Sequence, residues 1–254
     1  MRVESVPSAP GAGGDSIEGL DSVSWVEPAS ILAVSGSPSS GRASVAGSSS
    51  GRAFVSGADI SEFDQHRATA EQKDAYGEAT AKGNRWLRQL EKPLIAMVQG
   101  FCIGGGLAIS LSADVRIATP GSTFGIPAAR LGLGYGFSGL AALARLVGPS
   151  VARDILFSAR FLPADEALRV GLINRIVPEE ELETEVRRYA EMIAGNAPLT
   201  VHAAKVALRE WEREAGSRDL ARVDALVNAC FDSDDYREGR RAFAEKRRPI
   251  FHGS

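Results

Sequence analysis

The sequence has little of the chemistry that marks metal centres, disulfide scaffolds or nucleic-acid-binding surfaces. It holds two cysteines and three histidines in 254 residues, and neither Cys102 nor Cys230 stands in a CxxC or Cys/His spacing, which argues against a zinc site or a disulfide framework. The net charge of -3 offers no basic surface to nucleic acid. Long apolar runs and a signal-peptide pattern are also lacking. We therefore expect a protein of the reducing cytoplasm with no membrane segment.

Residues 1–50 have a different composition from the rest of the chain. Fourteen of them are serine, seven are glycine and none is lysine. Their apolar residues are scattered, without a sustained period of 2 or 3.6. Such a segment buries too little surface to offset its chain entropy. We expect it to be largely disordered or loosely attached.

Residues 92–114 are the stretch around which the chain is organised. The apolar run Leu94–Val98 is too short for a buried helix and is bounded by Pro93 and Gly100, which predicts a strand buried on both faces. The triplet Gly104–Gly106 then opens a helix. Residues without a Cβ let a ligand oxygen approach the free N–H groups of the first helical turn. The same glycines also suit a tight strand-to-helix corner with no ligand.

The remaining segments alternate between strands and helices and end in helices. Ser61–Leu90 is polar and helix-prone, and we expect it to lie over a cleft. The loop 131–139 has glycine at alternate positions and places Tyr135 near the start of the next helix. Ser233 is an expected N-cap. The predicted strands are 53–55, 115–118, 123–127 and 172–177, and the predicted helices are 140–147, 151–159, 164–170, 179–194, 200–214, 219–231 and 233–248. This order predicts an α/β fold with a C-terminal helical extension.

Six sequence blocks, in order and spacing, resemble the crotonase superfamily, which is the enoyl-CoA hydratase/isomerase family. They cover about residues 51–251 and are the ranges 56–60, 92–106, 112–118, 124–127, 167–177 and 235–247. The resemblance implies a crotonase-like spiral of βαβ units, usually a trimer or a dimer of trimers. It also implies an acyl-CoA-binding core at 51–194 and a C-terminal helical trimerisation region at 195–254.

The resemblance assigns site residues through the family's motifs. Two backbone N–H groups, those of Ala58 and Gly105, would hold the thioester oxygen as it becomes an enolate. Coenzyme A would be part of the substrate, with no permanently bound cofactor. Further substrate contacts are implied in the same loops and in the C-terminal helix, often that of a neighbouring subunit: Asp59, Ile60, Phe101, Ile103, Gly104, Pro127, Ala128, Leu131, Phe243 and Lys246. The C-terminal helix has an alternative interpretation as an amphipathic tail with a solvated basic face.

The chain departs from the family's hydratase pattern at two positions. Hydratases of this family use two glutamates as general acid and base, and those positions are Ala108 and Ala128 here. Tyr135 resembles a tyrosine of the methylmalonyl-CoA decarboxylases of this superfamily, although those enzymes carry a histidine where this chain has Ala58. Tyr135 also suits a buried, hydrogen-bonded role without chemistry.

Three functional hypotheses follow. The first is an enzyme, an acyl-CoA lyase or isomerase of the enoyl-CoA hydratase family, that acts through an enolate, with a decarboxylase-like variant using Tyr135. The second is an acyl-CoA-binding protein without turnover, favoured by Ala108 and Ala128. The third is a damaged product, favoured by residues 1–50. The family normally carries a strand, a loop, a helix and a second strand there, and this segment has about the right length but a different character. Translation in a shifted reading frame that recovers near Gly51 would produce such a segment.

Overall fold

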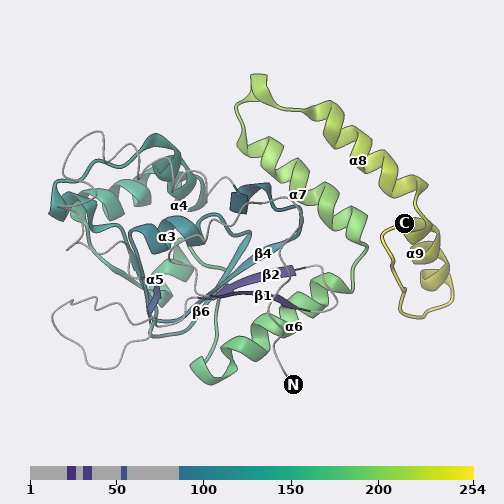
Figure 1. Cartoon of the computed structure of the whole chain (residues 1–254), viewed down its shortest axis with the longest axis horizontal. Helices are drawn as coiled ribbons and strands as arrows, with labels where there is room; N and C mark the ends of the chain where they lie inside the picture. The colour runs from purple at the N-terminus through teal and green to yellow at the C-terminus, as the bar shows by residue number, and fades with distance from the viewer. Residues whose placement is uncertain (1–21, 27–30, 36–52, 56–85) are drawn as a thin grey trace, which may run out of the picture.

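The computed structural model describes residues 22–26, 31–35, 53–55 and 86–254 of the chain. Its strands form two sheets, which lie beside each other with helices packed around them (Figure 1). The five-stranded sheet has the order β1-β2-β4-β6-β9, and all of its pairs are parallel except β1 with β2. Its strands are β1 Ser22–Val26, β2 Ile31–Ser35, β4 Leu94–Val98, β6 Val115–Ala118 and β9 Arg175–Ile176.

The first two strands correct one expectation about residues 1–50. Ser22–Val26 and Ile31–Ser35 form an antiparallel pair, and β2 continues the sheet by pairing in parallel with β4. Disorder or loose attachment is therefore wrong for these ten residues. The alternating Ser-Val-Ser-Trp of β1 covers only four residues of a serine- and glycine-rich segment, so the sequence lacks the sustained apolar period that identifies a strand.

The four-stranded sheet has the order β3-β5-β7-β8. The strands β3, β5 and β7 run parallel, and β8 is antiparallel to β7. The bounds are β3 Ala53–Val55, β5 Phe101–Ile103, β7 Thr123–Gly125 and β8 Leu162–Pro163. The chain passes from one sheet to the other between β4 and β5, across Gln99 and Gly100 alone, and Gly100 has a φ of 73°.

Strand β4 has the buried character that its sequence predicts, and its alternate residues serve two different cores. Leu94, Ala96 and Val98 join the main cluster, which also contains Leu107, Phe124, Leu143 and Ile155. Ile95 faces the opposite side and packs with Ile117, Leu182, Val186 and Ala190. The two-residue period of a strand explains this division. The second cluster attaches helix α6, Leu182–Ala194, to the five-stranded sheet.

Helices α3, α4 and α5 contribute to the main core. Their bounds are α3 Gly105–Ser110, α4 Phe137–Ser158 and α5 Ala164–Arg169. Within α4, Gly148 has non-helical dihedrals, with φ 76° and ψ 159°, and Pro149 follows it. The predicted break at Gly148-Pro149 is thus confirmed, with one helical segment on each side. Of the predicted helix Ser61–Leu90, residues 86–89 are helical and the part before them lies outside the described residues.

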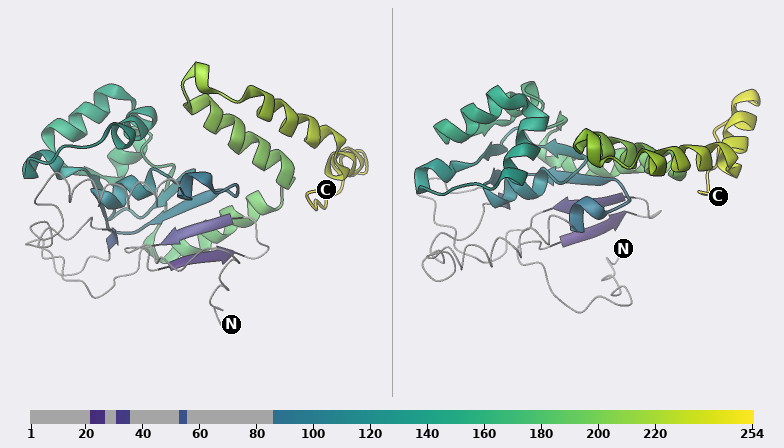
Figure 2. Two further views of the ribbon diagram at one scale, coloured as in Figure 1. Left: turned by 45° about the horizontal axis from the view of Figure 1, so that its top comes forward. Right: turned by 90° about the horizontal axis from the view of Figure 1, so that it is seen from above.

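The C-terminal helices extend away from the two sheets, as both views of Figure 2 show. They are α7 Pro198–Glu212, α8 Leu220–Asp232 and α9 Asp234–Ala244. An ion pair between a buried lysine and an exposed aspartate fastens α7 to the sheet: Lys205 Nζ lies 2.6 Å from Asp114 Oδ2 and donates to the Lys92 carbonyl at 2.6 Å. Ser233 caps α9 by accepting from the Tyr236 N–H at 3.0 Å, as predicted. The predicted strand 172–177 is shorter than expected, because only Arg175–Ile176 pair with β6.

Candidate functional site

The candidate site lies at the carboxyl ends of three neighbouring parallel strands. Strands β3, β5 and β7 lie side by side, with a register shift between Ala53 and Val55 of β3, and Cys102 stands between Val55 and Phe124. Loops that leave the same edge of a parallel sheet converge there, which is where open α/β sheets bind ligands. The segments leaving β5 and β7 are residues 104–110 and 126–139.

Gly104 and Gly105 make the turn from β5 into α3. Gly104 has φ 57° and ψ -114°, a conformation that residues with a Cβ rarely adopt, and its N–H donates to the Gly125 carbonyl at 2.8 Å. Gly105 is the single exposed residue between Phe101 and Ser110. Its N–H has no acceptor among the residues that the structure describes, as expected in a first helical turn. A main-chain donor is therefore available to a ligand at this edge.

The segment after β7 forms the facing side of the edge. It is a 3-10 helix, η2 Pro127–Leu131, that ends at Gly132 with φ 64°. Pro127 and Ala128 are half-buried, and Ala128 packs against the main core. Leu131 is 46% exposed. The hydrogen bond from Gly104 to Gly125 joins the start of this segment to the start of α3.

Tyr135 lies in the loop between η2 and α4. Its side chain is half-buried and packs against the main core. The ring lies beside Gly139 in the first turn of α4, where a Cβ would stand 3.7 Å from the tyrosine Cδ1. The aromatic side chain is thus fixed between the loop and the helix start, as the glycine-rich sequence around it allows.

Ionisable groups are scarce in the two segments that form this edge. Neither 104–110 nor 126–139 contains an aspartate, glutamate or histidine, and only Arg130 and Tyr135 can ionise. Ala108 occupies the second half of the first turn of α3, half-buried, with its N–H donating to the Gly104 carbonyl. Beneath the edge, burial raises the pKa of the Cys102 thiol to about 12, which leaves it protonated and unreactive. No cluster of metal-binding side chains exists among the described residues.

The predicted site residues fall into three groups. Ile103, Gly104, Gly105, Pro127, Ala128 and Leu131 come together at the edge, Phe101 stands at the start of β5 rather than at its carboxyl end, and Tyr135 lies on the adjoining loop. Ala58, Asp59 and Ile60 lie outside the described residues. Phe243 and Lys246 are exposed on and after α9, at the opposite end of the molecule from α3 (Figure 1). Within one chain the structure does not bring these two to the edge.

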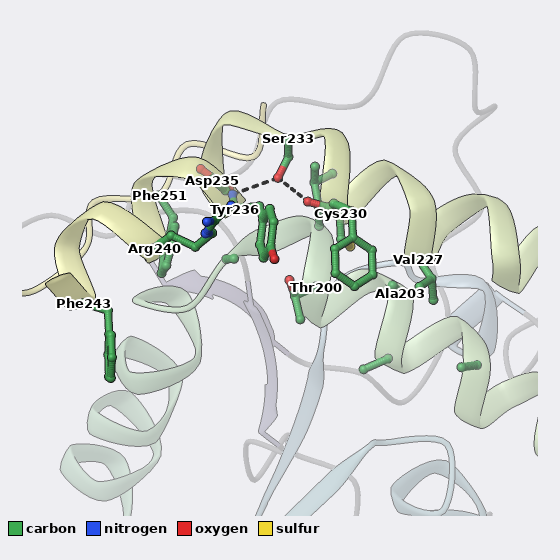
Figure 3. A pocket seen from close by; sticks show the side chains of 16 residues that line it. Thr200, Ala203, Val227, Cys230, Ser233, Asp235, Tyr236, Arg240, Phe243 and Phe251 are labelled. Atoms are coloured by element: carbon green, nitrogen blue, oxygen red, sulfur yellow. Dashed lines mark hydrogen bonds between the residues drawn. The ribbon is translucent and has the colours of Figure 1, made fainter.

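Sequence reasoning missed a groove among the C-terminal helices. It has a volume of about 680 Å³ and lies between α7, α8 and α9. Figure 3 shows Thr200 and Ala203 from α7, Cys230 from α8, and Tyr236 and Phe243 from α9 around it. Phe243 is 87% exposed. The available signal was a set of small side chains at 197, just before α7, and at 200, 203, 204 and 207 within it.

Comparisons with known proteins agree with this architecture of two sheets, parallel strand ends and a helical extension. The profile of the family described as enoyl-CoA hydratase/isomerase matches residues 31–254. The chain therefore belongs to the enoyl-CoA hydratase/isomerase family, and the predicted crotonase-like α/β fold is confirmed. The match begins at residue 31, which places Ile31–Ser35 within the family's sequence as well as its sheet.

Two relatives and one solved structure show the range of similar proteins. The chain is 39% identical over 192 residues to a short-chain-enoyl-CoA hydratase of Clostridium acetobutylicum, covering 76% of this chain and 73% of that one. It is 34% identical over 181 residues to methylmalonyl-CoA decarboxylase of Escherichia coli, covering 70% and 69%. An enoyl-CoA hydratase/isomerase family protein of Hyphomonas neptunium has a TM-score of 0.78 at 32% identity, covering 89% and 81%. Across the described part of the chain, every helix is too short or too polar to traverse a bilayer.

Proposed function

We propose that this chain binds an acyl-CoA thioester and stabilises its enolate through two main-chain N–H groups, those of Gly105 and Ala58. The observation that carries the proposal is the exposed Gly105 N–H, which has no acceptor in the described part of the chain and stands where β3, β5 and β7 end together. Ala58 follows the end of β3 by three residues. Coenzyme A enters and leaves as part of the substrate, and no other cofactor is required.

Main-chain donors suit this chemistry because the negative charge develops on the thioester oxygen and not on the acyl side chain. A single donor of this kind typically contributes about 10²–10³ in rate, or about 2.7–4 kcal/mol. The surrounding side chains then shape the acyl site without taking part in the reaction. We assign that role to Asp59 and Ile60, to Phe101 of β5, and to the edge residues Ile103, Pro127, Ala128 and Leu131.

The acid and base groups available at the edge distinguish two candidate reactions, water addition and decarboxylation. Because positions 108 and 128 are alanine, water addition by a pair of glutamates has no acid or base in the described segments of the edge. A decarboxylase-like reaction needs only the enolate site and a group that orients the leaving carboxylate. Tyr135, fixed on the adjoining loop, favours this candidate, as does the similarity to a methylmalonyl-CoA decarboxylase. Binding without turnover is the remaining candidate.

The assembly we propose is a homotrimer, or a hexamer made of two trimers, formed through residues 195–254. The exposed apolar side chains of the C-terminal helices support it, since Trp211, Phe231 and Phe243 are 67%, 59% and 87% exposed in the single chain. In such an assembly Phe243 and Lys246 would contact the coenzyme A bound to a neighbouring subunit.

The test is a panel of acyl-CoA thioesters, including crotonyl-, malonyl- and methylmalonyl-CoA, with products identified by mass spectrometry. Turnover that falls at least tenfold in Tyr135→Phe, with Tyr189→Phe unchanged, supports the decarboxylase-like enzyme. Tyr189 is a matched control because it lies on α6 beneath Arg175, away from the edge. Micromolar binding of butyryl-CoA with no turnover supports the binding protein. Failure to bind any acyl-CoA would overturn the proposal.

A further inference from the structure

Arg116 is a buried arginine whose guanidinium binds carbonyl oxygens. It belongs to β6 and is 3% exposed. Its Nη1 donates to the carbonyls of Ala113 and Ser110 at 2.7 and 3.2 Å, and its Nε donates to the Leu172 carbonyl at 2.8 Å. Among the residues that the structure describes, no carboxylate forms an ion pair with it. Burial lowers the pKa of Arg116, so the charged side chain is held here at a cost in free energy.

Two of these three carbonyls belong to the end of α3. Ser110 is the last residue of the helix, and Ala113 closes the turn that follows. Carbonyls at and just after a helix C-terminus have no later helical N–H to accept from. The Ser110 carbonyl accepts from the Ala113 N–H at 3.1 Å, and Arg116 is a second donor to it and a donor to the Ala113 carbonyl. Together with the bond from Gly104 to Gly125, this contact holds α3 at both of its ends.

The short length of α3 connects its far end to the candidate site. Six residues of α-helix span about 9 Å, so a shift at Ser110 displaces Gly105 as well. The backbone from which Arg116 projects is itself fixed. Its N–H donates to Asn174 Oδ1 at 2.8 Å, and its carbonyl accepts from the Asn174 N–H at 2.9 Å.

We propose that Arg116 is a positioning residue that aims the Gly105 N–H at the thioester oxygen by fixing the end of α3. The inference rests on the proposed enolate site and adds a residue on a different strand, outside the ligand-binding edge. Misplacing a catalytic group by about 1 Å can cost about 10²-fold in rate. Loss of Arg116 should therefore weaken the polarisation of a bound thioester more than it weakens binding.

The experiment measures the carbonyl stretching frequency of carbonyl-labelled butyryl-CoA, which carries no double bond to hydrate, when bound to the intact protein. Wild type should lower this frequency relative to free butyryl-CoA. Arg116→Met should bind butyryl-CoA within about threefold of wild type and lose most of the frequency shift, with turnover of any substrate found in the panel reduced about 10²-fold. Arg116→Lys, which keeps a buried donor, should recover part of both. It also provides a folded variant if Arg116→Met does not fold.

A second variant separates positioning from stability. Val186→Ala removes a buried side chain from the core on the α6 face of the sheet, away from α3. It should lower the melting temperature and leave the frequency shift unchanged. Arg116 variants that keep the full shift would overturn the positioning role, and so would an equal loss in Val186→Ala. A wild-type protein that binds butyryl-CoA with no shift would instead refute the proposed donors themselves.

Discussion

Gly104 shows how much of the candidate site depends on one backbone conformation. Its φ of 57° and ψ of -114° are open to glycine and strained for other residues, although a Cβ there would meet nothing within 4 Å. Gly104→Ala should therefore lower the free energy of unfolding by about 1–3 kcal/mol through backbone strain alone. It should also weaken butyryl-CoA binding, since Gly105 follows directly. Chemical denaturation and calorimetry measure the two effects.

Gly121→Ala is the matched control for this substitution. Gly121 is exposed, a Cβ there also meets nothing within 4 Å, and its φ lies outside the positive range. Its replacement should change stability by no more than about 0.5 kcal/mol. Equal effects of the two substitutions would mean that the conformation of Gly104 imposes no strain.

Single residues were predictable from sequence where their role is local. The turn at Gly104–Gly106 and the cap at Ser233 depend on neighbours within a few positions, and the structure confirms both. Arg116 was not predictable as a partner of α3, although Ser110 and Ala113 lie only six and three residues away, because no sequence pattern shows that its buried side chain turns back to these carbonyls. The pairing of Lys205 with Asp114 was not predictable either, because the two residues are 91 positions apart in the sequence.

At the scale of elements, the segment after α9 is folded back along that helix by two acidic side chains. Glu238 accepts from Arg241, from Arg247 and from the Ile250 N–H, and Asp235 accepts from the N–H groups of His252 and Gly253 at 2.7 and 2.8 Å. Phe251 is thereby placed against Gly239 at the edge of the groove. We call residues 247–253 the return segment.

The return segment should loosen in acid. The hydrogen bonds from Arg247 and Arg241 hold the pKa of Glu238 well below its ordinary value near 4.5. A carboxyl whose pKa is lowered in the folded state stabilises that state above the ordinary value, and the contribution is lost as the pH falls below it. Hydrogen exchange at Ile250, corrected for the intrinsic pH dependence, should accelerate below about pH 4.5.

Glu238→Gln tests this assignment. The variant should show fast exchange at Ile250 already at neutral pH and should lack the acid-dependent increase. Glu183→Gln on α6 alters an exposed pair with Arg187 and should leave the exchange of the return segment unchanged. A pH profile that Glu238→Gln does not alter would contradict the role given to Glu238.

Elements were predictable where an apolar period or a glycine boundary was present. Leu94–Val98, Val115–Ala118 and the break at Gly148 match the expectation from sequence. Strand β5 was missed because Phe101–Ile103 is only three residues long and follows β4 almost at once. Strands β1 and β2 were missed because the composition of the segment around them does not indicate strands. Only their pairing, with each other and with β4, identifies them.

At the scale of the whole molecule, the reactivity of the Cys230 thiol can report whether the proposed assembly forms. Cys102 is fully buried, and its raised pKa keeps it protonated below about pH 12, so native protein should not react there with a thiol reagent. Cys230 lines the C-terminal groove. If neighbouring subunits cover this region, alkylation of Cys230 should be slow at high protein concentration and faster on dilution. Mass spectrometry after timed quenching measures the rate.

Two controls complete the measurement. Cys230→Ser should abolish labelling of native protein, and both cysteines should react after unfolding. Sedimentation at the same concentrations reports the assembly directly. A labelling rate that does not vary across the range in which the assembly dissociates would contradict the proposed location of the contact.

The overall architecture was predictable because the order of strands, helices and glycine turns is encoded block by block. The six sequence blocks and the family profile lead to the same fold. The groove between α7, α8 and α9 was not predictable, since it depends on how three helices pack against one another. The position of Phe243, far from the edge within one chain, likewise depends on that packing.

The two-residue passage at Gln99 and Gly100 has a consequence for engineering this chain. Strand β4 ends in one sheet and β5 begins in the other with no loop between them to absorb a change in length. An insertion there would rotate the whole four-stranded sheet, and with it Gly105, relative to the helical extension. The loops that leave β7 carry no such constraint, so new acyl specificities are better sought by varying residues 127–136 than by altering the joint at 99–100.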